Sequence, residues 1–116
     1  MKFKVTPRDQ EGIKMKMLEI GEDCSLYDLA EKIVKVFHVD FGHCFGFFSD
    51  TESDSYLNSK KKYELFTDLI EEGDDIEPTG AFSVKRTKVS DVWKNSGDKM
   101  LFLFDYGDCL EWIVEY

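Results

Sequence analysis

The stretch KMLFLFDYGDCLEWIVEY, residues 99–116, decides the fold that this sequence predicts. Apolar residues alternate on both sides of Gly107 and Asp108, which is typical of two antiparallel strands joined by a tight turn. Because successive side chains of a strand point to opposite faces, each strand presents one row of large side chains. The rows comprise Phe102, Phe104 and Tyr106 on the first strand, and Leu110, Trp112, Val114 and Tyr116 on the second. Two such rows need an apolar cover.

Residues 25–37 supply this cover as an amphipathic helix. Ser25 is suited to the N-cap, and Asp28, three positions later, completes a capping box. Apolar residues then recur at the spacing of one helical face, while charged residues occupy the other face. The apolar set is Leu26, Leu29, Ala30, Ile33, Val34 and Phe37. We therefore expect this helix to lie across the sheet and to face the aromatic rows.

The remaining segments predict shorter elements. Alternation indicates strands over residues 2–6 and 13–20, paired as a first hairpin whose second strand buries Ile13, Met15 and Met17. A third strand over residues 44–48 is expected beside that hairpin. The other expected elements are a loop over 50–59, a short helix over 63–70, an acidic loop over 71–80, a short strand around 81–84 and a helical turn over 89–93 capped by Ser90.

This order of elements predicts an α+β fold in a single domain, residues 1–116. The expected architecture is a β-grasp-like mixed sheet, covered by one main amphipathic helix and closed by a C-terminal β-hairpin. A chain of 116 residues that is 42% hydrophobic can bury a continuous core without disulfides or a structural metal.

Charge and cysteine content exclude several classes of function. The net charge is -9, from 24 acidic and 15 basic residues, and such a surface repels phosphate backbones, so we expect no nucleic-acid binding. The sequence contains neither a secretory signal nor an apolar run long enough to span a membrane. Cys24, Cys44 and Cys109 form no CxxC motif. Reduced thiols in the cytoplasm are the expectation.

Two blocks of the sequence, which together cover about half the chain, resemble a known family. These are LYDLAEKIVKVFHVDFGHCFGF, residues 26–47, and VSDVW…GDKMLFLFDYGDCLEWIVE, residues 89–115. They resemble the plasmid pRiA4b ORF-3-like family, with its helix of the form TLxxLHxxIxxAFxW and its strand pair of the form YDFGDxWxHxIxVE. The resemblance implies an α+β domain found on plasmids and in many microbial genomes, and it brings no established activity.

Candidate site residues follow from this resemblance. His43 stands at the family's His after the helix, and Asp105, Gly107 and Asp108 stand at its acidic turn. Leu110 and Trp112 occupy the positions where the family has Trp and His, so this chain lacks the second imidazole. Tyr106 can donate a hydrogen bond near the turn. The candidate binding residues are His43, Asp105, Tyr106, Gly107, Asp108 and Trp112.

The carboxylates near the turn have two interpretations. Asp105, Asp108 and Glu111 could form an acid-base or cation site, since neighbouring like charges separate carboxylate pKa values. Alternatively, Asp is a preferred turn residue because its side chain accepts hydrogen bonds from the following backbone amides. We favour the structural interpretation, and we predict no catalytic residue.

No metal or cofactor is expected from the other clusters. Residues 50–55, DTESDS, carry oxygens at the first, third and fifth positions of a calcium loop, but Ser55 and Lys61 occupy the sixth and twelfth. His38, His43 and Cys44 match no compact zinc-ligand spacing. His43 and Cys44 are also adjacent in sequence, and adjacent strand residues face apart, which argues against a nucleophilic pair.

The sequence lacks the common enzymatic motifs, namely the Walker loop, GxGxxG, HExxH and GxSxG. We therefore expect a non-enzymatic module that binds a protein or peptide of unknown identity through a sheet edge or groove. Pairing of two copies through a terminal strand is a further expectation. The alternative is a small-molecule or hydrolytic site near His43 and residues 105–108.

Overall fold

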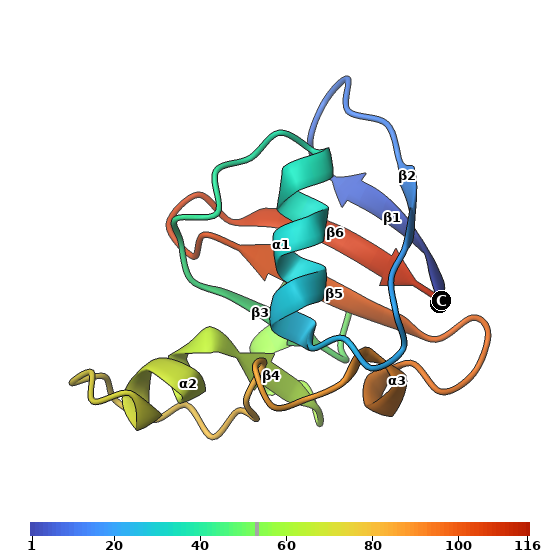
Figure 1. The fold of residues 1–116 in the computed structure, drawn as a ribbon. Helices are drawn as coiled ribbons and strands as arrows, with labels where there is room; N and C mark the ends of the chain where they lie inside the picture. The colour runs from blue at the N-terminus through green and yellow to red at the C-terminus, as the bar shows by residue number, and fades with distance from the viewer. Residues whose placement is uncertain (53) are drawn as a thin grey trace.

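β5 and β6 lie side by side in the middle of the sheet (Figure 1). The computed structural model describes residues 1–52 and 54–116, which contain one six-stranded sheet in the order β2-β1-β6-β5-β3-β4. The strands are β1 (Lys2–Arg8), β2 (Lys16–Glu19), β3 (Phe45–Phe48), β4 (Lys62–Glu64), β5 (Lys99–Phe104) and β6 (Leu110–Glu115). The helices are α1 (Leu26–Val36), α2 (Leu65–Glu71) and α3 (Val89–Val92), with a 3-10 turn, η1 (Tyr56–Asn58).

The sheet is antiparallel, so the expectation of a mixed sheet is wrong. All five pairs of neighbouring strands in the described chain run antiparallel. Parallel neighbours that follow one another in the sequence need a long crossover connection, usually a helix. Here α1 connects β2, at one edge, to β3, four places along the sheet, so it joins no adjacent pair. The fold is α+β.

α1 lies across one face of the sheet, as the sequence predicts (Figure 1). Ser25 Oγ accepts a hydrogen bond from the Asp28 backbone, and the Asp28 carboxylate accepts one from the Ser25 backbone, so the capping box is confirmed. The buried helical residues are Leu26, Leu29, Ala30, Ile33 and Val34. They belong to one hydrophobic cluster with Phe102, Phe104 and Trp112 of the two central strands.

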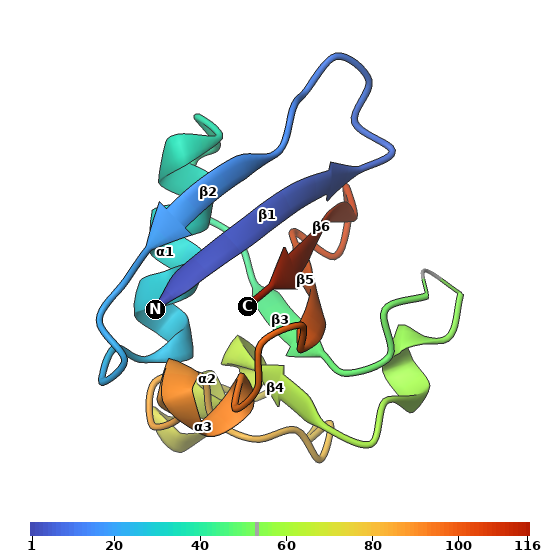
Figure 2. The ribbon, with the colours of Figure 1, turned by 90° about the vertical axis from the view of Figure 1, so that its right-hand side faces the viewer.

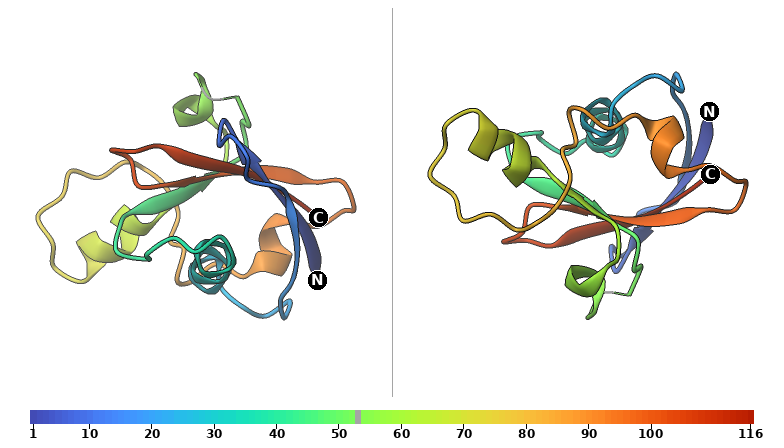
Figure 3. Two further views of the ribbon diagram at one scale, coloured as in Figure 1. Left: turned by 90° about the horizontal axis from the view of Figure 1, so that it is seen from above. Right: turned by 90° about the horizontal axis from the view of Figure 1, so that it is seen from below.

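β5 is buried on both faces. Met100, Phe102 and Phe104 pack on the side of α1, whereas Leu101 and Leu103 cluster with Phe48 on the opposite side. There η1 forms a small second layer, with the Tyr56 ring 4.8 Å from that of Phe48. Figure 2 and Figure 3 show η1 and α1 on opposite sides of the sheet. The expected loop over residues 50–59 thus contains a packed turn, and Ser53 of that loop lies outside the described residues.

β2 buries the opposite face from the one expected. Leu18 and Ile20 are buried, whereas Ile13, Met15 and Met17 are 50%, 45% and 59% exposed. The reason is the register with β1, in which Phe3 faces Leu18 and therefore sets which side of β2 meets the core. Residues 13–15 precede the strand altogether.

Four other expectations need correction. β3 lies between β5 and β4 and not beside the first hairpin, because its register aligns Phe47 with Phe102 of β5. The segment expected as one helix over 63–70 begins as strand β4 and becomes α2 at Leu65. Lys88, not Ser90, is the N-cap of α3, and it provides no side-chain cap. The expected strand near residues 81–84 is a single bridge at Phe82 beside β4.

Candidate functional site

Asp105 builds the turn between β5 and β6. Its backbone φ of +64° takes the chain out of the strand directly after Phe104. Asp105 Oδ1 then accepts hydrogen bonds from the backbone amides of Gly107 at 3.1 Å and Asp108 at 3.3 Å. This arrangement is the one by which Asp stabilises turns. One carboxylate oxygen of the candidate site is therefore committed to the backbone, and Asp108 itself is exposed.

His43 meets this turn from the segment before β3. Its Nδ1 lies 3.5 Å from Asp105 Oδ2, and the Asp105 amide donates a 2.8 Å hydrogen bond to the carbonyl of Cys44. The His43 side chain is half exposed, and its ring meets Phe104 edge to face. Two predicted site residues from distant parts of the sequence are thus brought together. They form a surface imidazole-carboxylate pair.

Tyr106 does not join this pair. It packs on the opposite face of the sheet, where its Oη donates a 2.5 Å hydrogen bond to Glu64 Oε2. Burial, and then the adjacent Glu64 carboxylate, raise the pKa of the Tyr106 phenol. Because Glu64 is only 2% exposed, the pair is an internal contact between the β5–β6 turn and β4. Glu64 is the residue that the sequence analysis missed, and its signal is a single carboxylate in an apolar run.

Gly46 makes this internal contact possible. A Cβ at this position would lie 2.9 Å from the Phe48 ring and 2.9 Å from Tyr106 Oη, closer than any ordinary contact. Glycine in a strand interior often marks such a close approach. The neighbouring Cys44 thiol has a pKa raised by burial and by the carboxylates of Asp74 and Glu64, so it stays protonated and is a poor nucleophile.

Trp112 belongs to the core on the α1 side. Its ring stacks on Phe102, with centroids 5.4 Å apart, and contacts Phe37 at 5.6 Å. It is fully buried, and its indole Nε1–H has no hydrogen-bond partner among the described residues. In contrast, Trp93 in the same cluster donates its Nε1–H to the carbonyl of Val114 at 3.0 Å. Trp112 therefore contributes to packing and not to the His43 surface.

The described residues contain no group of three or more His, Cys, Asp or Glu side chains placed to hold a metal ion. The three cysteines are free thiols. Within residues 1–52 and 54–116, no helix has the length and apolar character needed to cross a bilayer. The turn is a polar surface feature that presents the His43 imidazole and the carboxylates of Asp105 and Asp108.

Comparison with known proteins places the chain in a family. The family model described as plasmid pRiA4b ORF-3-like protein matches residues 1–116. The chain belongs to the pRiA4b ORF-3-like family. The crystal structure of MM3350, a protein of unknown function from Methanosarcina mazei Go1, is similar to this pRiA4b ORF-3-like domain, with a TM-score of 0.71 at 22% sequence identity. The similarity covers 98% of this chain and 57% of MM3350, and it shows a common fold. No curated protein matches the sequence.

The edge of β2 is a second candidate site on the pRiA4b ORF-3-like domain, and the sequence analysis missed it. Among the described residues, β2 pairs with β1 and with no other strand. Met17 on this strand is exposed, and so are Ile13 and Met15, which lie at alternate positions in the segment that leads into it. A cavity of about 270 Å³ adjoins it, lined by Lys2, Met17, Leu18 and Glu19. We call this surface the β2 edge.

Proposed function

We propose that this pRiA4b ORF-3-like domain is a non-enzymatic module that binds a protein or peptide by adding one of its strands to the β2 edge. The observation that carries the proposal is the direction of the backbone groups. Met1 and Ile20 exchange both hydrogen bonds, with N to O distances of 2.8 and 2.9 Å. Along an antiparallel pair of strands, hydrogen-bonded residue pairs alternate with pairs that make no bond to each other. Leu18 is therefore hydrogen-bonded to β1, and the backbone amides of Met17 and Glu19 point away from β1.

Exposed side chains support the same proposal. Free strand edges bind extended peptides through backbone hydrogen bonds, and pockets for alternate side chains provide specificity. The opposite edge, β4, is less available because Phe82 accepts a hydrogen bond from the Glu64 amide at 3.0 Å and donates one to the Lys62 carbonyl at 2.8 Å. The β2 edge combines outward amides with exposed apolar side chains, and native proteins usually protect such edges. Its outward Glu19 carbonyl accepts a hydrogen bond from Lys32 Nζ, which an added strand would displace.

The test compares variants of the β2 edge with a matched control. Met17→Pro removes an outward amide without costing a bond to β1, and Met17→Ser removes the side chain alone. Leu57→Ser is the control because Leu57 is equally exposed, at 58%, on η1. Each protein is immobilised and exposed to host-cell lysate, and the captured proteins are identified.

We expect the same partner with the unchanged protein and with Leu57→Ser, less with Met17→Ser, and none with Met17→Pro. Thermal unfolding by circular dichroism verifies that each variant is folded. Identical capture by all four proteins would contradict binding at the β2 edge.

A second candidate is a small-molecule or hydrolytic site at His43 and residues 105–108. The 3.5 Å contact between His43 and Asp105 favours it. Against it, Asp105 Oδ1 is held by the turn, and Tyr106 is directed away. Substrate profiling of the protein with His43→Ala and Asp108→Asn as controls tests this candidate, and an activity that survives both substitutions would exclude this site. The β-grasp-like architecture and the cytoplasmic location of the protein remain predictions.

A further inference from the structure

We propose that the segment bound at the β2 edge is an extended acidic strand in which apolar and acidic side chains alternate. This inference rests on the proposed function and adds the chemistry of the partner. It comes from the charges that surround the β2 edge and from the two faces that an added strand would present.

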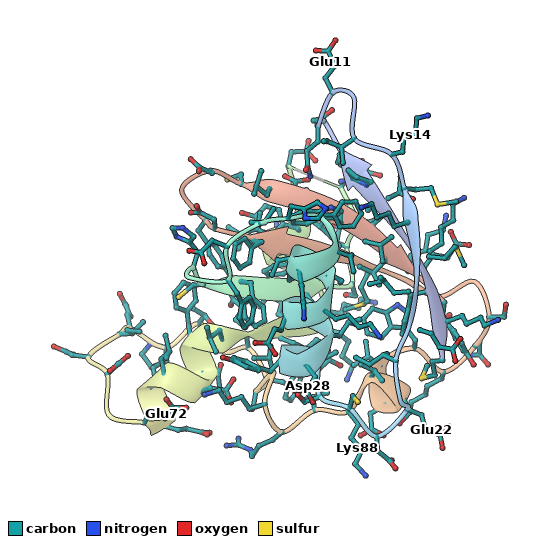
Figure 4. All side chains as sticks on the ribbon, turned by 45° about the horizontal axis from the view of Figure 1, so that its top comes forward. Glu11, Lys14, Glu22, Asp28, Glu72 and Lys88 are labelled. Carbon is teal, nitrogen blue, oxygen red and sulfur yellow. The ribbon has the colours of Figure 1, made fainter. Side chains whose placement is uncertain are left out.

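Lysines gather around the β2 edge although the chain carries a net charge of -9. Six of them are exposed on β1, near β2 and on α1, namely Lys2, Lys4, Lys14, Lys16, Lys32 and Lys35. Two contacts place α1 beside β2: Lys16 Nζ donates to the Val36 carbonyl at 2.7 Å, and Lys32 Nζ donates to the Glu19 carbonyl. Figure 4 shows Lys14 projecting into solvent from the connection that leads into β2.

Carboxylates lie among these lysines, and their positions decide which side of the surface is positive. Glu19 lies across from Lys2 on the neighbouring strand, and Asp28 is held in the capping box of α1. Glu31 is exposed on α1, and Glu11 lies at the far tip of the β1–β2 connection (Figure 4). Glu22 and Asp23 are exposed directly after β2, so lysines and carboxylates are equal in number over the whole surface. On the α1 side of β2, Lys16, Lys32 and Lys35 lie near only two carboxylates, Glu31 and the capped Asp28, so that side is locally positive. Such a local potential selects partners of opposite sign.

The two faces of the β2 edge differ in chemistry. Met17 and the cavity beside it lie on the face away from α1, whereas Lys16 points toward α1 and lies over the Phe37 ring. A strand added to β2 places alternate side chains on these two faces. One set meets Met17 and the cavity that Lys2 and Glu19 also line; these two charges are of opposite sign, and Met17 suits an apolar residue. The other meets the ammonium groups of Lys16, Lys32 and Lys35, which suits Asp or Glu.

A second copy of the chain fits this surface less well. Two-fold pairing of β2 with itself would bring the same lysines of both copies together, and opposed like charges across strands are destabilising. Charge complementarity therefore favours an acidic peptide segment over self-association, and the oligomeric state is one outcome of the test.

The probes are fluorescent peptides of about nine residues, enough for one strand. One alternates Val and Glu, one has the same composition with Val and Glu in separate blocks, and one alternates Val and Lys. Binding is measured by fluorescence polarisation. We expect the alternating Val/Glu peptide to bind at least about tenfold more tightly than either of the others, because charge and periodicity must both match.

Charge reversal provides the decisive variant. Lys32→Glu with Lys35→Glu should reverse the preference toward the Val/Lys peptide. Lys60→Glu with Lys61→Glu changes the net charge equally at another surface and should leave the preference intact. Sedimentation of the unchanged protein and of Met17→Pro tests self-association.

Failure of this inference is distinguishable from failure of the proposed function. Equal binding of the acidic and basic peptides, with loss of both in Met17→Pro, would overturn the acidic partner and leave strand addition standing. Equal binding of the blocked and alternating peptides would overturn the extended geometry. Unchanged binding of the Val/Glu peptide to Met17→Pro would exclude the β2 edge altogether. A dimer that Met17→Pro abolishes would assign the edge to a second copy and overturn the acidic partner.

Discussion

Two tryptophans in one hydrophobic cluster differ by a single hydrogen bond. Trp93 donates its indole N–H to the Val114 carbonyl, whereas the indole N–H of Trp112 is buried without a partner among the described residues. Burying a donor without a partner costs free energy, while removing a satisfied donor leaves its acceptor unpaired. The same substitution should therefore have different consequences at the two positions.

We predict that Trp93→Phe lowers the free energy of unfolding by about 1 kcal/mol or more beyond the effect of Trp112→Phe. Both changes remove a similar volume from the cluster, so the packing losses largely cancel in the comparison. Urea unfolding followed by circular dichroism measures both. An equal loss in the two variants would show that the indole of Trp112 is as well satisfied as that of Trp93.

The buried phenol of Tyr106 predicts a dependence of stability on alkaline pH. Because folding raises the pKa of Tyr106, the folded state holds the phenolic proton more tightly than the unfolded state does. Its contribution to the free energy of unfolding is complete below about pH 10, the value for an unfolded tyrosine, and is lost as the pH rises beyond it. Tyr56, Tyr63 and Cys44 have pKa values shifted in the same direction.

We therefore expect stability to fall between about pH 8 and about pH 11, and to fall less in Tyr106→Phe. Urea unfolding at both pH values measures the difference. At neutral pH the same substitution should cost about 1–3 kcal/mol, because Glu64 loses its donor while it stays buried. An equal alkaline decline in the two proteins would show that Tyr106 ionises as readily as a free phenol.

At the scale of elements, the sequence predicts a helix or strand best where several independent sequence signals indicate the same element. In α1 the capping box, the apolar spacing and the length all indicate one helix, and the structure confirms its start within one residue. In β2 both faces carry apolar side chains, Met15 and Met17 on one and Leu18 and Ile20 on the other. Alternation alone could not choose between them. The register with β1, which is a contact between separate segments, determines which face of β2 is buried.

Ser25 and Ser90, the two predicted helix caps, provide a test at the scale of elements. Ser25→Ala should lower the free energy of unfolding by about 1 kcal/mol, because it removes a capping bond at 3.1 Å. Ser90→Ala should change it by less than about 0.5 kcal/mol, because Ser90 lies inside α3 and caps nothing. Chemical unfolding of both variants compares them, and a Ser90 effect as large as that of Ser25 would restore Ser90 as a cap.

The sequence predicted the candidate site only in part, because local signals predict local features and not contacts between distant segments. Asp and Gly favour the turn locally, and the resemblance of two sequence blocks suggested His43 as its neighbour. The direction of Tyr106 was not predictable, because a positive φ at Asp105 breaks the alternation that the strand pattern assumes. Trp112 was predicted both in the aromatic row under the helix and as a binding residue; the structure buries it in the core under α1, away from the His43 surface.

At the scale of the whole molecule, the two ends of the chain meet. β1 and β6 are neighbours in the sheet, with Lys4 aligned to Glu115, and the termini lie close together in Figure 2. Local patterns predict which strands exist, but the position of β6 between β1 and β5 depends on contacts between distant segments. The strand order was therefore beyond sequence reasoning.

This proximity predicts that a circular permutant folds. Joining residue 116 to residue 1 through a flexible linker of about six residues, and opening the chain between Glu77 and Pro78, leaves every named strand and helix intact. We expect a cooperative thermal transition within about 5–10 °C of the original. A permutant opened inside α1, between Lys32 and Ile33, should not fold. Circular dichroism compares them, and an unfolded first permutant would contradict the prediction.

The place of β6 also governs when the protein can fold during its synthesis. Among the described strands β1 is made first, yet β6, one of its two neighbours, is made last. Until residue 115 has emerged, the nascent chain holds β1 and β5 with unpaired edges and an apolar face that α1 cannot close. We therefore expect chaperones that shield extended apolar segments to bind this domain until β6 has emerged.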